Sequence, residues 1–190
     1  MSQAPSLREP WYCDGTVEIL HTARFESPIG TLLAASSERG LVYLELPHAN
    51  GRGFAGWQRV AAPMTRATEG FAPNRAVVAQ VQEYLAGKRR EFDVPLDLRG
   101  TPFQIACWKA LLAIPYGETR TYADQARAVG RPAAVRAVGA ANGANPIALV
   151  VPCHRVVATG GKLGGYGGGL PLKARLLALE RAVPAQDRLL

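Results

Sequence analysis

The sequence has few cysteines and no long hydrophobic run. Three cysteines among 190 residues, Cys13, Cys107 and Cys153, are too few and too widely spaced for a disulfide framework, so at least one thiol is free. The longest apolar stretches, residues 110–114 and 147–151, each end at a proline and fall far short of the ~20 residues that span a bilayer. The polar N-terminal segment also lacks the apolar core of a secretory signal. We therefore predict a cytoplasmic protein with no membrane segment.

Acidic residues are scarce in the second half of the chain. The whole sequence has 22 Lys+Arg and 15 Asp+Glu, a formal net charge of +7. Residues 1–98 hold ten basic and eleven acidic residues, net −1, whereas residues 99–190 hold twelve and four, net +8. A basic half beside a neutral half indicates a polyanionic partner, most often nucleic acid. A solvated basic surface would have the same composition, so charge alone leaves both interpretations open.

The first half alternates β-prone segments with turns. Three such segments, residues 17–20, 31–35 and 41–46, predict a small antiparallel meander. Residues 48–71 show no clear period and are expected to form an irregular connection. Helical spacing of apolar residues predicts a helix over 72–88, and residues 92–98 alternate like a strand. We place a domain boundary after Leu98, which gives domains 1–98 and 99–190.

The second half is predicted to be mainly helical. Thr101 as N-cap, Pro102 at the first helical position and Gln104 in a capping box predict a helix that ends near Ala113. Cys107 falls on the apolar face of this helix, and free cysteine is among the most buried residue types. We therefore expect Cys107 to be a core thiol.

Two short helices joined by a tight turn follow. The first is predicted from a Thr121 cap to about Val129 and the second over residues 133–143, which is a helix-turn-helix pattern. The second helix is mostly alanine and glycine, with Arg136 as its one large projecting side chain. Such a helix could lie close to a nucleic-acid backbone. It could equally use its small residues to pack against another helix.

The most informative segment surrounds the third cysteine. The apolar run 147–151 predicts a buried strand-like segment that delivers Cys153, with His154 beside it. A thiol is nucleophilic as the thiolate, and a neighbouring proton acceptor or cation favours that form. A Cys-His pair also needs a third group to orient the imidazole. Among the four acidic residues of the second half, Glu180 in a predicted helix over 172–182 is the first choice, although it could be an ordinary surface glutamate.

A glycine-rich loop separates these two parts. Residues 160–169 contain seven glycines, which lets the backbone approach a ligand closely. Neither of the phosphate-binding glycine motifs is present. We expect a lid over the thiol.

In order and spacing, these residues resemble the O6-alkylguanine-DNA alkyltransferases. The matching segments are residues 152–156 (PCHRV), 136–139 (RAVG), 145–146 (NP), Tyr166 and Glu180, and a weaker signature stands at residues 27–30 (SPIG). The resemblance covers roughly Thr101 to Glu180. It implies an α+β fold, with a small ribonuclease H-like N-terminal domain and a helical C-terminal domain that carries the helix-turn-helix.

The resemblance also implies the activity. A member of this family binds duplex DNA through the minor groove, flips O6-alkylguanine out of the stack and transfers the alkyl group irreversibly to its own cysteine, here Cys153. One molecule then repairs one lesion and is consumed. We expect no cofactor. We also expect a monomer that works in the cytoplasm and, if its source is prokaryotic, associates with the nucleoid. Whether molecules bind DNA cooperatively is left open.

Family positions assign roles on the DNA side. Arg136 would fill the space left by the flipped base, and base extrusion costs a few kcal/mol. Tyr122 would crowd the neighbouring phosphate and hydrogen-bond the flipped guanine. Ala137 and Gly139 would face the DNA from the recognition helix.

Other family positions assign roles in the pocket. The backbone carbonyls of Cys153 and Val156 would meet the exocyclic amine of guanine, and the Tyr166-Gly167 loop would meet the base face and O6. Glu180 would orient His154, which accepts the Cys153 proton through a water molecule. Asn145 would tie the recognition helix to the active-site segment, and we expect Arg155 to be structural.

Departures from the family pattern matter as well. Cys13, His21 and His48 do not fall at the positions of the structural zinc that some members bind, so we expect no metal, and Cys13 has no expected role. Non-catalytic relatives carry Trp in place of Cys153. Gly167 stands where some relatives carry a hydroxyl side chain, which would change the pocket's width or its alkyl preference.

Two other functions remain as alternatives. One is a DNA-binding regulator that senses alkylation through Cys153, and the other is a cysteine hydrolase built on Cys153, His154 and Glu180. The regulator would usually need a further cysteine-rich metal domain. The hydrolase would turn over repeatedly and would not need a basic helix-turn-helix.

Overall fold

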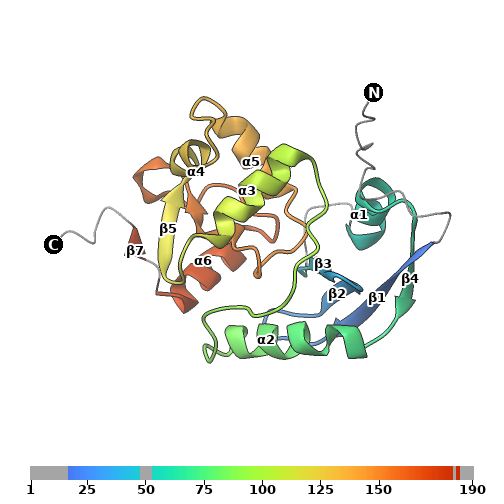
Figure 1. Ribbon diagram of the computed structural model, residues 1–190. Helices are drawn as coiled ribbons and strands as arrows, with labels where there is room; N and C mark the ends of the chain where they lie inside the picture. Colours follow the sequence, from blue (N-terminus) through green and yellow to red (C-terminus); the bar gives the residue numbers. More distant parts are fainter. Residues whose placement is uncertain (1–16, 48–52, 182, 185–190) are drawn as a thin grey trace, which may run out of the picture.

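A four-stranded sheet organises the first part of the chain in the computed structural model, which describes residues 17–47, 53–181 and 183–184 (Figure 1). Cys13 and His48 therefore lie outside the described residues. The strands are β1 (Glu18–Phe25), β2 (Leu32–Ser37), β3 (Gly40–Glu45) and β4 (Thr65–Glu69). The first three form the predicted antiparallel meander, and β4 pairs parallel to the free edge of β1, giving the order β3-β2-β1-β4.

Both faces of this sheet are covered. Leu33 of β2 packs in a cluster on the side of α1 (Gly53–Ala61), whereas Leu32 packs in the larger core on the side of α2 (Arg75–Leu85). Successive strand residues point to opposite faces, so every residue of β2 is buried. A short 3-10 turn, Ala72–Asn74, leads into α2, and the helix predicted over 72–88 is confirmed as far as Leu85.

The prediction of an irregular connection over 48–71 is wrong for residues 53–71, because α1 and β4 lie there. These elements bury little of their surface, since Gly56 is the only buried residue of α1 and β4 is largely exposed. Aromatic packing fixes α1 instead: the Tyr43 ring lies 5.5 Å from Phe54 and 5.1 Å from Trp57 between centroids. A parallel strand also requires a crossover connection, and α1 lies within it.

The strand expected over 92–98 is also wrong. This segment makes one isolated bridge, in which Leu41 N donates to Pro95 O and Asp97 N donates to Leu41 O, both at 2.9 Å. Pro95 has no N–H to donate, so it cannot contribute a donor to a longer ladder. The segment runs extended along β3 and leads into the helical part.

The described residues of the second part contain four α-helices: α3 (Pro102–Leu112), α4 (Tyr122–Ala128), α5 (Val135–Gly143) and α6 (Leu170–Leu179). The Thr101 and Gln104 capping box starts α3 as predicted. Cys107 is fully buried, as expected, and the neighbouring Trp108 donates its indole N–H to Ala141 O of α5 at 2.9 Å. The α+β fold is therefore confirmed. No helix in the described ranges is long and apolar enough to cross a membrane.

The segment that precedes the third cysteine is not the predicted strand. Residues 147–151 form a turn, in which Val151 N donates to Ile147 O at 2.9 Å and Leu149 has a φ of 71°. Ile147 alone forms a bridge, to Leu44 of β3. The short parallel strands of this region, β5 (Glu118–Thr121), β6 (Val156–Val157) and β7 (Val183–Pro184), have the order β6-β5-β7. The apolar run is buried as expected, but as a turn packed between the two parts of the chain.

Candidate active site

Cys153 begins a one-turn 3-10 helix, Cys153–Arg155, directly after Pro152, and its side chain is almost completely buried. Asn145 Nδ2 donates to Cys153 Sγ at 3.2 Å and to Val151 O at 2.8 Å, while its Oδ1 accepts from Ile147 N at 3.0 Å. Asn145 follows the end of α5, where its N–H donates to Asn142 O. One amide side chain therefore joins α5, the buried turn and the thiol.

The thiol of Cys153 keeps its proton in this environment. Burial raises the pKa of Cys153, and the opposing effects of the Asn145 hydrogen bond and the Lys173 charge do not cancel it. Since the thiolate is the nucleophile, the proton has to be removed by a nearby base.

His154 is the neighbouring base and is completely buried. Its Nε2 lies 3.0 Å from Glu180 Oε1. Burial would raise the pKa of Glu180, but hydrogen bonds from His154, Arg155 and Tyr84 outweigh it and hold the value at about 2. An ionised carboxylate only accepts, so Nε2 carries the imidazole proton. Burial lowers the pKa of His154, and its Nδ1 has no hydrogen-bond partner among the described residues. The imidazole is neutral, with Nδ1 as an open acceptor.

Arg155 neutralises the carboxylate from the other side. Its Nε donates to Glu180 Oε2 and its Nη2 to Oε1, both at 2.9 Å, and its Nη1 donates to Ile114 O at 2.6 Å. Gly117 N also donates to Glu180 Oε2, at 3.2 Å. Arg155 is thus a buried structural residue. Glu180, the C-cap of α6 rather than part of the predicted helix to 182, sits at the centre of this network.

Two residues of the site escaped the sequence analysis. Tyr84, from α2, donates its hydroxyl to Glu180 Oε1 at 2.6 Å. Lys173, from α6, is completely buried and donates to Val156 O at 2.6 Å and to Gly165 O at 3.1 Å. A lysine one turn before the apolar Leu176 is a signal that could have been noticed. Nothing local distinguishes Tyr84 from an ordinary core tyrosine.

Two tyrosines, one from the glycine-rich loop and one that bonds to it, lie near the thiol. Tyr122, the first residue of α4, donates its hydroxyl to Gly165 O at 3.4 Å. Tyr166 is buried, its ring centroid is 6.4 Å from that of His154, and its hydroxyl has no partner within the described ranges. Burial, with the nearby charge of Cys153, raises the pKa of both tyrosines, so both hydroxyls stay protonated. A Cβ added at Gly167 would meet no atom within 4 Å, so there is room for a side chain there.

The helix-turn-helix presents small residues on its surface. Val138 and Ala141 are the buried residues that pack α5 against its neighbours, whereas Arg136 and Ala137 are exposed. A Cβ at Gly139 would lie 3.9 Å from the Tyr122 ring, which places this part of α5 next to the start of α4. Small residues of α5 therefore lie both in its packed side and on its exposed side. Arg136 is the long side chain on the exposed side.

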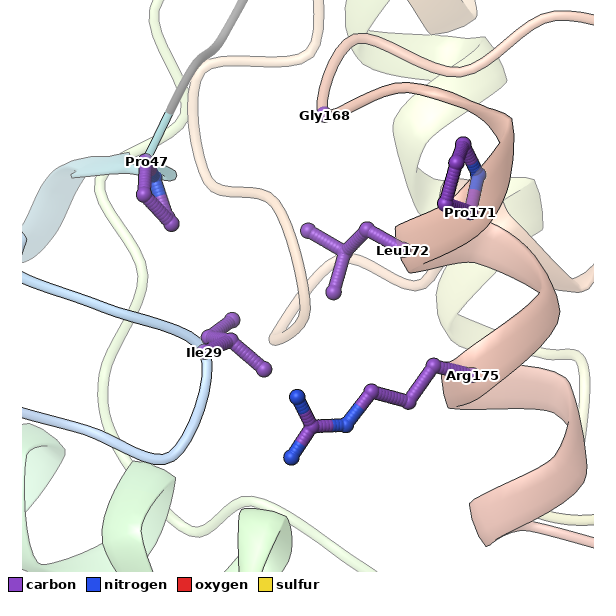
Figure 2. A pocket seen from close by; sticks show the side chains of 6 residues that line it. All are labelled: Ile29, Pro47, Gly168, Pro171, Leu172 and Arg175. Atoms are coloured by element: carbon purple, nitrogen blue, oxygen red, sulfur yellow. The ribbon is translucent and has the colours of Figure 1, made fainter.

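A surface pocket of about 350 Å³ lies beside α6 (Figure 2). It is lined by Ile29, Pro47, Gly168, Pro171, Leu172 and Arg175, and Figure 2 shows the Arg175 side chain extending toward Ile29. Neither Cys153 nor His154 lines it, so it is separate from the thiol site. Within the described ranges, no group of three or more His, Cys, Asp or Glu side chains could hold a metal ion.

Comparison with known proteins gives consistent matches over most of the chain. The family described as "6-O-methylguanine DNA methyltransferase, ribonuclease-like domain" matches residues 20–98, and "6-O-methylguanine DNA methyltransferase, DNA binding domain" matches residues 102–182. The methylated-DNA–protein-cysteine methyltransferase of Mycobacterium tuberculosis is 46% identical over 169 residues, which cover 89% of this chain and 97% of that protein. The protein of the same name from Methanosarcina acetivorans is also 46% identical, over 85% of this chain and 98% of its own.

Solved structures agree. The crystal structure of Mycobacterium tuberculosis OGT in complex with DNA has a TM-score of 0.73 at 47% identity, covering 87% of this chain and 96% of that one. The O6-methylguanine-DNA methyltransferase from Pyrococcus kodakaraensis has a TM-score of 0.57 at 26% identity, over 85% and 98% of the two chains. The two-part fold implied by the sequence resemblance is therefore confirmed.

Proposed function

The chain belongs to the 6-O-methylguanine DNA methyltransferase family, and we propose that Cys153 is the cysteine to which it transfers the alkyl group. The protein is a DNA repair methyltransferase that binds DNA and takes the alkyl group from methylated DNA onto its own cysteine. The observation that carries the assignment is the buried Cys153 thiol, bonded to Asn145 and followed by the His154–Glu180 pair. Cys107, the other described cysteine, lies in the core against α4 and α5 without such partners.

The reaction is a displacement at the alkyl carbon. The sulfur of Cys153 attacks the methyl group on O6 of guanine, so an S–C bond forms while the C–O6 bond breaks. The electron pair of that bond stays on O6, which becomes the guanine carbonyl oxygen. The thiol proton is taken up first by His154 Nδ1 through a water molecule and ends on N1 of guanine. The S–C bond of the thioether product is stable, so the alkyl group stays on Cys153 and each molecule acts once.

The neighbouring backbone can hold the guanine. The carbonyl of Cys153 accepts one hydrogen bond, from Val156 N, and the carbonyl of Val156 accepts one, from Lys173. A carbonyl oxygen has two lone pairs, so each can accept another bond, here from the exocyclic amine of guanine. Tyr166 and Gly167 then meet the base face and O6.

DNA is the partner, and the finer proposal is the minor groove of a duplex that contains O6-alkylguanine. Arg136 fills the gap left by the flipped base, and Ala137 and Gly139 allow α5 to approach the backbone. Tyr122, at the start of α4, crowds the neighbouring phosphate. The exposure of Arg136 and the small side chains beside it support this arrangement.

Three further points belong to the proposal. The domain boundary lies after Leu98, so that residues 1–98 are structural and residues 99–190 bind DNA and carry the chemistry. The protein acts as a monomer. It works in the cytoplasm, and with the nucleoid if its source is prokaryotic.

Intact-protein mass spectrometry tests the function directly. We expect a duplex with one O6-methylguanine to add one methyl group per protein, and peptide mapping to find it on Cys153. Cys153→Ser should gain no methyl group and still bind the duplex. Methylation of Cys107, or release of more than one product per protein molecule, would contradict the proposal. Tight binding without a mass gain would identify a recognition protein without chemistry.

A further inference from the structure

Tyr84 connects the sheet-bearing part of the protein to the proton-accepting pair. It belongs to α2, 70 residues before His154 in sequence, and is completely buried. Its hydroxyl oxygen lies 2.6 Å from Glu180 Oε1 and 3.2 Å from His154 Nε2. The hydroxyl, the carboxylate oxygen and the imidazole nitrogen therefore form a closed triangle of polar atoms.

The chemistry of the three groups fixes where the protons lie. Burial, strengthened by the charge of Glu180, raises the pKa of Tyr84 far above its ordinary value, so the hydroxyl keeps its proton and donates it to the carboxylate. The Tyr84 oxygen still has lone pairs, and the remaining donor within reach is Nε2–H of His154. Nε2–H is thus shared between two acceptors, Glu180 Oε1 and Tyr84 Oη.

We propose that Tyr84 is a positioning residue for alkyl transfer, which holds the imidazole proton of His154 on Nε2 so that Nδ1 stays open to the proton of Cys153. This inference rests on the proposed function of Cys153. Tyr84 touches neither the thiol nor the base; it acts through His154 and Glu180. The first part of the chain, proposed above as structural, thereby contributes to the chemistry of the second.

Several charged and titratable groups face His154, and the test has to separate Tyr84 from them. They are Glu180, Arg155 and Lys173, the buried tyrosines Tyr84 and Tyr166, and the adjacent Cys153. Removing the Tyr84 hydroxyl leaves Glu180 with the donors from Arg155 and His154, so no buried acceptor becomes unpaired. We therefore expect Tyr84→Phe to fold.

Tyr116→Phe is a matched control. The Tyr116 ring packs edge-on against Tyr84, with centroids 6.3 Å apart, and its hydroxyl donates to Leu179 O at 3.2 Å. The substitution removes a tyrosine hydroxyl from the same cluster without touching the carboxylate. Any loss caused only by weaker packing should be similar in the two variants.

The decisive measurement is the single-turnover rate of methyl transfer from a duplex with O6-methylguanine, recorded against pH at saturating DNA. Tyr84→Phe should be at least about tenfold slower at neutral pH, with an unchanged Kd for DNA. Without the Tyr84 donor, Glu180 holds the imidazolium more strongly, which raises the pKa of His154. The midpoint of the rising limb should move to higher pH, and the gap to wild type should narrow as the pH rises.

Other outcomes overturn the inference. A rate and midpoint equal to those of Tyr116→Phe, or a loss of the same size at every pH, would mean that Tyr84 only packs. The 15N spectrum of His154 in the wild-type protein gives a second test that needs no variant: the proton should reside on Nε2, and a proton on Nδ1 would contradict the proposal. A wild-type protein that is never methylated at Cys153 would instead refute the proposed function.

Discussion

Glu180 and Lys173 are buried charges of opposite sign that α6 brings to the same site. Glu180 accepts hydrogen bonds from His154, Arg155 and the Tyr84 hydroxyl, which hold its pKa at about 2 against the opposing effect of burial. Among the described residues, Lys173 has only carbonyl oxygens as hydrogen-bond partners. Burial lowers its pKa to about 8, and the nearby charge of Cys153 opposes this only in part. The folded protein therefore stabilises the ionised form of Glu180 and destabilises the charged form of Lys173.

Lys173 should therefore make the stability of the protein depend on alkaline pH. Between its folded pKa of about 8 and its unfolded value of 10.5, the unfolded chain binds more protons, so stability rises with pH. We expect the wild type to gain up to roughly 3 kcal/mol relative to Lys173→Met over this range. Guanidinium chloride unfolding at several pH values between 8 and 10.5 measures the difference.

The same comparison in a Cys153→Ser background removes a thiol whose ionised form, reached at alkaline pH, favours the charged form of Lys173. There the gain should begin at lower pH. If the free energies of unfolding of wild type and Lys173→Met changed in parallel across this pH range, the pKa of Lys173 would not be lowered in the folded protein.

The sequence brought together the proposed nucleophile, Cys153, and the neighbours that contact it or His154, but not all of the site. Cys153, His154 and Asn145 lie within nine residues of one another, and the motif that carries them is specific. Tyr84 and Lys173 reach the site only through tertiary packing, because α2 and α6 converge on the one-turn helix of Cys153. Tyr84 cannot be told from an ordinary core tyrosine in sequence, and although the position of Lys173 is a signal, the partners of both residues can be known only once the helices are placed.

At the scale of elements, α5 is the part on which the proposed DNA recognition depends. Its buried side is formed by Val138, Ala141 and Asn142, so its position on the protein does not depend on Arg136. Within the described residues, the Arg136 side chain makes no hydrogen bond or ion pair. It is a long cationic group on an exposed helix face, available to enter the base stack.

Arg136→Ala should separate chemistry from base flipping. We expect transfer from free O6-methylguanine base to stay within about twofold of wild type, while transfer from duplex DNA falls at least about tenfold, because extrusion costs a few kcal/mol that Arg136 helps to offset. Methylation rates on the two substrates measure this. Arg66→Ala, an exposed arginine on β4, removes the same charge from the other part of the chain and should change neither rate. Equal losses on free base and duplex for Arg136→Ala would rule out the flipping role.

Helices whose first residues are marked by capping residues could be predicted from the sequence. Elements that depend on pairing with residues far away in the sequence could not. Thr101 and Thr121 each form the expected cap, and both helices begin at the next residue. In contrast, β5, β6 and β7 are two to four residues long and exist because parallel partners are brought together from across the second part. The turn at 147–151 has the composition of a strand, but only Ile147 finds a strand partner, Leu44 of β3, and the other residues are buried in the core as a turn.

At the scale of the whole molecule, charge is separated along the chain. Residues 1–98 have a net charge of −1 and residues 99–190 a net charge of +8. The helix-turn-helix lies in the basic part and the sheet in the neutral part (Figure 1). Attraction to DNA should therefore be directional and should orient the protein before specific contacts form.

Binding to undamaged duplex should weaken as salt rises, because neutralised phosphates release counterions. We expect log K to fall linearly with log salt, with a slope of about −0.9 for each phosphate contacted. Fluorescence anisotropy between about 50 and 200 mM salt measures the slope. Affinity that does not change with salt would exclude the basic part as the contact surface.

The two parts of the chain are joined by more than the covalent link between them. Leu44 pairs with Ile147, and Tyr84 bonds to Glu180, so residues on both sides of the exposed turn that follows α2 complete one buried site. A chain cut in that turn would yield two fragments, neither of which holds the whole proton-accepting triangle. If Tyr84 positions His154 as proposed, methyl transfer would be fast only in fragments that had reassociated, and since the thioether is permanent, rapid methylation of Cys153 would report that reassociation.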